Sequence, residues 1–142
     1  MNSLKLIVAL SFFGTSLAFS KEKAKDVVKE KTEVSFVSPK NGEAVGTTFK
    51  IQFGLSGMKI RPAGEDVNDK SSGHHHLIID GDFIPEGQVV PTDDTHKHFG
   101  KGQVETELTL TKGKHKLTLQ LADGAHLSYG KNMSTTIEVS VK

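Results

Sequence analysis

Alternating apolar and polar residues recur along most of the chain and predict β-strands. The clearest run is "TTFKIQFGLSG", residues 47–57, in which Phe49, Ile51, Phe53 and Leu55 occupy every second position. Because successive side chains of a strand point to opposite faces, a period of two places all four on one face. Comparable runs predict strands near 33–38, 74–81, 103–113, 115–124 and 135–142.

Turn residues separate these runs about every ten positions, and no segment shows a convincing helical period. Asn41-Gly42 predicts a tight turn, because Asn-Gly accepts positive φ at little cost. The segment 108–124, "LTLTKGKHKLTLQLADG", predicts a hairpin with Lys112-Gly113 at its turn. Six or seven strands of this kind predict an all-β fold, an antiparallel immunoglobulin-like β-sandwich. Residues 58–73 and 82–94 are expected to be long irregular connections.

The first twenty residues have the layout of a secretory signal peptide. Lys5 precedes an apolar run from Leu6 to Phe19, and small residues allow cleavage after Ala18 or Ser20. That run is shorter than the roughly 20 residues of a membrane-spanning helix, so we expect no membrane span and a periplasmic or secreted protein. The predicted organisation is a signal peptide at 1–20, a charged flexible tether at 21–32 and the immunoglobulin-like domain at 33–142.

Composition removes several classes of function. The chain has no cysteine, which excludes disulfides, cysteine-based zinc ribbons and thiol catalysis. Its net charge of +1 carries no general nucleic-acid footprint. Tryptophan is absent and Tyr129 is the only tyrosine, which weakens a sugar-binding interpretation because such sites usually rely on exposed aromatic platforms.

The histidines are the main candidates for chemistry, and the predicted strands give them a geometry. In "GHHHLIIDG", His74 and His76 share one face of a strand, whereas His75 points with Leu77 and Ile79 and is expected to be a packed, hydrogen-bonded core residue. His96 and His98 in "THKHFG" share a face in the same way. His126 in "DGAHLSYG" forms a third arm, and His115 is expected to be exposed to solvent.

Imidazole suits copper and zinc, so these pairs predict a site for a divalent transition metal. The second shell of such a site usually contains a carboxylate that orients the imidazole. Three aspartates close in sequence are candidates for that role: Asp80, Asp93 and Asp94. The predicted metal ligands are His74, His76, His96, His98 and His126.

No catalytic residue is predicted. Ser72, His74 and Asp80 could form a triad only on paper, because no nucleophile elbow surrounds the serine. A zincin helix motif is absent, and a copper histidine brace would need a histidine at the mature N-terminus. A metal-dependent enzyme remains an alternative, with a general base such as Glu65, Asp66 or Asp94. A tag remnant does not explain "SSGHHH", which is internal and continues into an apolar strand.

Several motifs in order resemble a family of bacterial exported domains of unknown function. They are "SPKNGEAVG", "GLSGMKIRPAGE", "GHHHLIIDG", the block "HKHFGKGQVETELTLTKGKHKLTLQLADGAHLSYG" and the closing "TIEVSVK". The resemblance covers about residues 33–142 and implies a small periplasmic β-sandwich without an established activity. More loosely, residues 110–126 and the last strand are similar in layout to the end of periplasmic copper-resistance immunoglobulin-like domains. Those domains bind copper through histidines near strand ends, but this chain lacks their N-terminal histidine.

The sequence therefore favours a binding module that holds copper or zinc through paired histidines, for metal buffering, delivery or sensing. The alternative is a structural or protein-interaction sandwich, with a possible periplasmic protein partner, whose histidines hydrogen-bond the long loop to the sheets. The two differ in one structural requirement, because metal binding needs three or four imidazole nitrogens that approach a common point.

Overall fold

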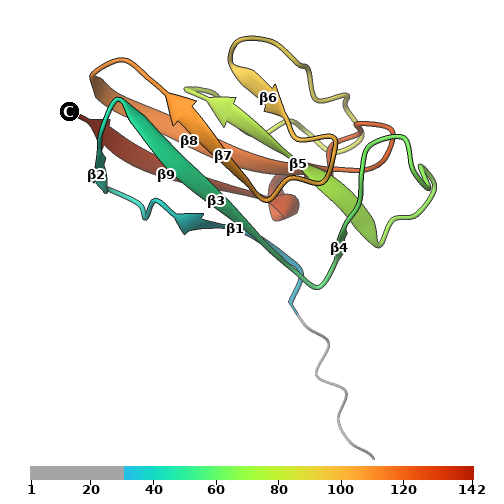
Figure 1. Cartoon of the computed structure of the whole chain (residues 1–142). Coiled ribbons are helices and arrows are strands. Elements are labelled where there is room, and N and C mark those ends of the chain that lie inside the picture. The colour runs from blue at the N-terminus through green and yellow to red at the C-terminus, as the bar shows by residue number, and fades with distance from the viewer. Residues whose placement is uncertain (1–30) are drawn as a thin grey trace, which may run out of the picture.

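The structure is a computed structural model that describes residues 31–142 of the chain (Figure 1). The predicted signal peptide and all but the last two residues of the predicted tether lie outside the described residues. The described part contains strands and one short 3-10 helix, Lys131–Met133. The strands are β1 (Glu33–Ser38), β2 (Ala44–Val45), β3 (Thr48–Ser56), β4 (Lys59–Ile60), β5 (Ser72–Ile79), β6 (His96–His98), β7 (Glu105–Thr109), β8 (Gly113–Ala122) and β9 (Ser134–Val141).

The strands form two sheets that pack face to face as an immunoglobulin-like β-sandwich, as predicted (Figure 1). The smaller sheet has the order β1-β3-β7, and the larger has the order β2-β9-β8-β5-β4, with β6 also paired to β5. All pairings are antiparallel except the short ones of β2 with β9 and β4 with β5. Between the sheets lies a core to which the predicted alternating residues contribute, among them Ile51, Phe53, Leu77, Leu119 and Val139.

The predicted hairpin at 108–124 is wrong, because its two arms belong to different sheets. β7 pairs with β3 in the smaller sheet, whereas β8 pairs with β5 and β9 in the larger one. The Lys112-Gly113 segment therefore crosses from one sheet to the other. Alternation shows which residues of each arm face a core. Leu108 and Leu117 do face the same core, but each from a different sheet.

Strand β5 is buried along its whole length, which is unusual for one strand of a sandwich. One face, with His75, Leu77 and Ile79, points toward the smaller sheet. The other face is covered by the connection 82–94 and the loop 123–130, which bond to each other through the amide of Val90 and the carbonyl of His126 at 2.9 Å. The long connection predicted from the sequence thus covers the outer face of the larger sheet.

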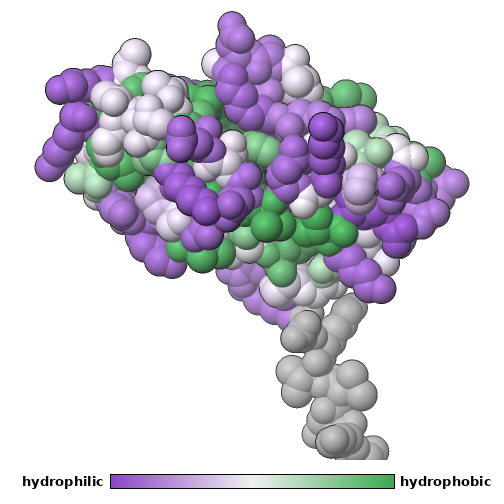
Figure 2. All heavy atoms as spheres, in the orientation of Figure 1, coloured by the Kyte–Doolittle hydropathy of each residue, from purple (hydrophilic) through white to green (hydrophobic). Residues whose placement is uncertain are grey.

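The surface seen in Figure 2 is mostly hydrophilic, with a patch of hydrophobic side chains near its centre. No helix among the described residues is long and apolar enough to cross a bilayer.

His115 is largely covered, although the sequence predicted an exposed side chain. Its side chain is 13% exposed, and its Nδ1 lies 2.9 Å from the Asp80 carboxylate. Its Nε2 lies 2.9 Å from the carbonyl oxygen of Thr111. Both partners accept hydrogen bonds, so the doubly protonated imidazolium is the form that satisfies both. The hydrogen bond to Asp80 raises the pKa of His115, and this outweighs the effect of burial.

We expect this contact between Asp80 and His115 to make stability depend on pH. Because the folded-state pKa of His115 is raised, its contribution is fully present below the unfolded value and is lost as pH rises through the folded value. Urea unfolding of the wild-type protein and His115→Gln, at about pH 5.5 and about pH 8.5 with a chelator, measures this. The stability difference between the two proteins should be larger at the lower pH, and an equal difference at both would contradict the assignment.

Candidate metal centre

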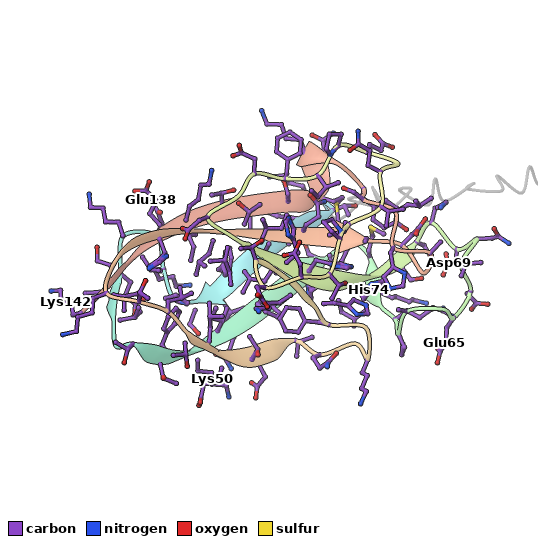
Figure 3. All side chains as sticks on the ribbon, turned by 90° about the horizontal axis from the view of Figure 1, so that it is seen from above. Lys50, Glu65, Asp69, His74, Glu138 and Lys142 are labelled. Atoms are coloured by element: carbon purple, nitrogen blue, oxygen red, sulfur yellow. The ribbon has the colours of Figure 1, made fainter. Side chains whose placement is uncertain are left out.

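Two histidines of the site come from β5, where the period of two places them on the same outer face. His74 and His76 are both fully buried, and their ring centroids lie 4.9 Å apart. Their Nε2 atoms are 3.0 Å apart, so the two rings converge at their tips. Figure 3 shows His74 toward the end of the sandwich that carries Glu65 and Asp69, away from Lys142.

The third histidine comes from β6, the short strand at the edge of β5. His98 lies directly opposite His76 in the register, and its ring centroid is 5.0 Å from those of both His74 and His76. Gly100 makes room for this ring, because a Cβ on residue 100 would lie 2.2 Å from Cε1 of His98. A side chain at residue 100 would therefore displace the His98 ring.

The fourth histidine comes from the loop 123–127, far away in sequence. His126 has a positive φ of 65° and its Nε2 lies 3.2 Å from that of His98. The buried carboxylate of Asp123 holds this loop by accepting the amides of Ala125 at 2.9 Å and Leu127 at 3.0 Å. Asp123 also forms an ion pair with Lys70, which ties the loop to the connection that precedes β5.

These four residues form one compact group, which we call the four-histidine cluster: His74, His76, His98 and His126. Ligand nitrogens of three of them, His74, His76 and His98, lie within 4.8 Å of one another. The group could therefore hold a metal ion.

The buried members of the cluster are held in the neutral form that a metal requires. Burial lowers the pKa of His74 to about 4, with further lowering by His126 and His98. Burial also lowers the pKa of His76 to about 2, with His74 and His98 as the next causes. Burial and the neighbouring His126 lower the pKa of His98 as well. Neutral imidazole offers a nitrogen lone pair, which is the form that coordinates metals.

His96 does not join the cluster, although the sequence predicted it as a ligand. It shares the strand face of His98 but pairs with Ile78, which lies two residues farther along β5 than His76. A two-residue step moves a side chain about 6.6–7 Å along a strand, which takes it away from the cluster. Its Nδ1 instead lies 2.9 Å from a carboxylate oxygen of Asp93.

Of the three predicted second-shell aspartates, Asp93 does contact a predicted ligand, but that ligand, His96, lies outside the cluster. Asp80 contacts His115 and Asp93 contacts His96, while Asp94 is exposed. Within residues 31–142, Nδ1 of His74 and Nδ1 of His76 have no hydrogen-bond partner. The carboxylate that organises the site is Asp123, which acts on the loop backbone and was not singled out from the sequence. The Asp123-Gly124 turn, which precedes Ala125 and His126, was the available signal.

His75 lies on the opposite face of β5, as its position in the strand predicted. Its ring packs against Phe53 with centroids 5.2 Å apart, and it is fully buried. The predicted hydrogen bonding is wrong, because neither ring nitrogen has a partner among the described residues. Burial alone lowers the pKa of His75 to about 4, so the residue sits in the core as a neutral ring.

Comparisons with known proteins place the chain in a family without a described activity. A search of curated proteins finds no match. The chain is similar to the endo-β-1,4-mannanase from Thermotoga petrophila, with 16% identity and a TM-score of 0.46 over 87% of this chain and 21% of the enzyme's. It thus spans about a fifth of that enzyme's length.

The chain is also similar to the fibronectin(III)-like modules of Clostridium thermocellum CbhA, with 16% identity and a TM-score of 0.45, over 77% of this chain and 96% of that one. A family model described as "Domain of unknown function (DUF4399)" matches residues 51–142, a range that includes the whole four-histidine cluster. The chain therefore belongs to this family of domains of unknown function.

Proposed function

We propose that this protein is an exported, non-catalytic binding module that holds a divalent transition metal, copper or zinc, in the four-histidine cluster. Its role would be metal buffering, delivery or sensing. The observation that carries the proposal is the convergence of four imidazoles from three separate segments of the fold, with Nε2 contacts of 3.0 and 3.2 Å. Export is supported by the signal-like pattern of the first twenty residues.

The energetics of the cluster also favour a ligand. Buried polar groups in proteins nearly always have a partner, and an unpaired one costs about 1–3 kcal/mol. Here the Nε2 atoms of His74 and His76 lie 3.0 Å apart and those of His98 and His126 lie 3.2 Å apart, so within each pair at least one nitrogen carries no proton and directs its lone pair at the space between the rings. A cation at the centre would receive the converging lone pairs and turn an unfavourable arrangement into a favourable one.

The alternative, in which the histidines fasten the long loop to the sandwich, has less support. That loop is held by other groups, including Arg61 with Asp66, Lys70 with Asp123, and the hydroxyl of Tyr129, which donates to the carbonyl of Ser72. The ring-nitrogen contacts of the clustered histidines join His74 to His76 and His98 to His126. Their arrangement therefore fits a shared ligand better than a loop anchor.

We expect purified, untagged protein to bind zinc(II) or copper(II) tightly and with one ion per chain in calorimetric titrations. His98→Ala should weaken the affinity by at least about 100-fold, because it removes one of four ligands. His96→Ala is the matched control, since it removes an imidazole two residues away that faces Asp93. Absence of saturable binding, or equal losses in the two variants, would overturn the proposal.

A further inference from the structure

We infer that the four-histidine cluster imposes near-tetrahedral coordination, so that it fits zinc(II) without strain and disfavours the square plane that copper(II) prefers. This inference rests on the proposed function and adds the geometry and the ion that the site is built for. It is carried by the six distances among the four rings and by the backbone contacts that hold them.

The ring separations are nearly uniform. Five of the six centroid distances lie between 4.8 and 5.0 Å, and only that between His76 and His126 is longer, at 6.0 Å. Four imidazoles at metal–nitrogen distances of about 2.0–2.1 Å in a tetrahedron would place all six centroid pairs about 5.2 Å apart. In a square plane, four pairs would lie about 4.5 Å apart and two about 6.4 Å apart.

The observed pattern is that of a tetrahedron opened slightly along one edge. A square plane has two long pairs, which join opposite ligands and have no ring in common. Because His76 and His126 form one such pair, His74 and His98 would have to form the other. These two rings are 5.0 Å apart, so they would have to separate by about 1.4 Å to reach the planar arrangement.

The fold resists that separation. His74 and His98 lie on hydrogen-bonded neighbouring strands, and the amide of Phe99 donates to the carbonyl of His75 at 3.1 Å, between the two ligand positions of β5. On its other edge, β5 is paired with β8 over residues 74–79. The ligand backbones are therefore fixed before a metal arrives.

Four protein ligands complete a tetrahedron, and a catalytic zinc site keeps one position for water or substrate. A closed site of this kind suits storage, delivery or structural stabilisation by zinc. The geometry therefore agrees with the non-catalytic role proposed above and distinguishes it from metal-assisted hydrolysis.

Cobalt(II) is a spectroscopic probe of this geometry, because tetrahedral cobalt(II) absorbs visible light far more strongly than the octahedral ion. We expect titration of the untagged protein with cobalt(II) to produce intense visible bands that an equivalent of zinc(II) removes. His126→Ala should weaken or shift these bands, whereas His96→Ala should leave them unchanged. X-ray absorption of the zinc-loaded protein should show four nitrogen ligands at about 2.0 Å.

The possible outcomes separate the two proposals. Bound cobalt with only weak bands, or zinc with five or six ligands, would overturn the tetrahedral inference and leave metal binding intact. Binding of copper(II) without binding of zinc(II) would also overturn the tetrahedral inference and leave metal binding intact. If neither zinc, copper nor cobalt binds, the proposed function itself fails. If zinc(II) binds but cobalt(II) does not, X-ray absorption of the zinc-loaded protein alone tests the tetrahedral geometry.

Discussion

Replacing His76 by leucine should abolish metal-dependent stabilisation while changing the stability of the metal-free protein by less than about 1 kcal/mol. His76 is fully buried, and its ring centroid lies 4.9 Å from that of His74 and 5.0 Å from that of His98. Leucine has a similar volume and no polar atom. The change removes one unpartnered buried Nδ1 but also the Nε2 contact at 3.0 Å, so the two effects largely offset each other in the metal-free state.

The wild-type protein should respond strongly to metal. Zinc at 100 times its dissociation constant stabilises a folded protein by about 2.7 kcal/mol, which corresponds to an increase in melting temperature of roughly 10 °C for a domain of this size. Thermal unfolding followed by circular dichroism, with zinc and with EDTA, measures the shift. We expect the full shift in wild-type protein and in the control His96→Leu, and none in His76→Leu. A variant that keeps the shift would show that the ion binds elsewhere.

Much of the fold follows from local patterns. The alternation in β3 and β9 reflects one buried and one less buried face, a constraint that each strand carries in its own residues. The same rule separates His74 and His76 from His75 in the sequence, and the structure confirms that division. The existence and facing of the longer strands are local properties, and the sequence predicts them, whereas the two-residue strands β2 and β4 fall in segments predicted as a turn and a loop.

The pairing of strands depends on residues far apart in the sequence, and the incorrect predictions of the fold concern that pairing. The arms of the predicted hairpin would have satisfied the same alternation in either sheet, so nothing in residues 108–124 determined that β7 pairs with β3. His126 was a weaker candidate than His96 because spacing alone favours a second His-x-His motif. In the structure His126 joins the cluster and His96 does not. Asp123 turns the loop that carries His126 back over β5, whereas His96 pairs with Ile78, two residues beyond His76.

The site also depends on a position without any side chain. A Cβ at residue 100 would lie 2.2 Å from Cε1 and 2.4 Å from Nε2 of His98, well inside van der Waals contact. The backbone at Gly100 does not have a positive φ, so alanine is conformationally acceptable there. Substitution should therefore act through the ring of His98, which is partly exposed and free to move outward.

We expect Gly100→Ala to lower metal affinity by about 10- to 100-fold while the metal-free protein stays folded, because His98 must leave the position in which it faces the other three ligands. Calorimetric titration with zinc gives the affinity, and urea unfolding in EDTA gives the stability. Gly46→Ala is the matched control, because its new Cβ would meet only the Thr48 carbonyl oxygen at an ordinary 3.6 Å.

The double variant His98→Ala/Gly100→Ala makes the test specific. If Gly100 acts only through the His98 ring, the double variant should bind zinc no more weakly than His98→Ala alone, so the two effects are not additive. Additive losses would show instead that residue 100 disturbs β5 or the loop carrying His126. Unchanged affinity in Gly100→Ala would mean that His98 coordinates from a different position, or does not coordinate at all.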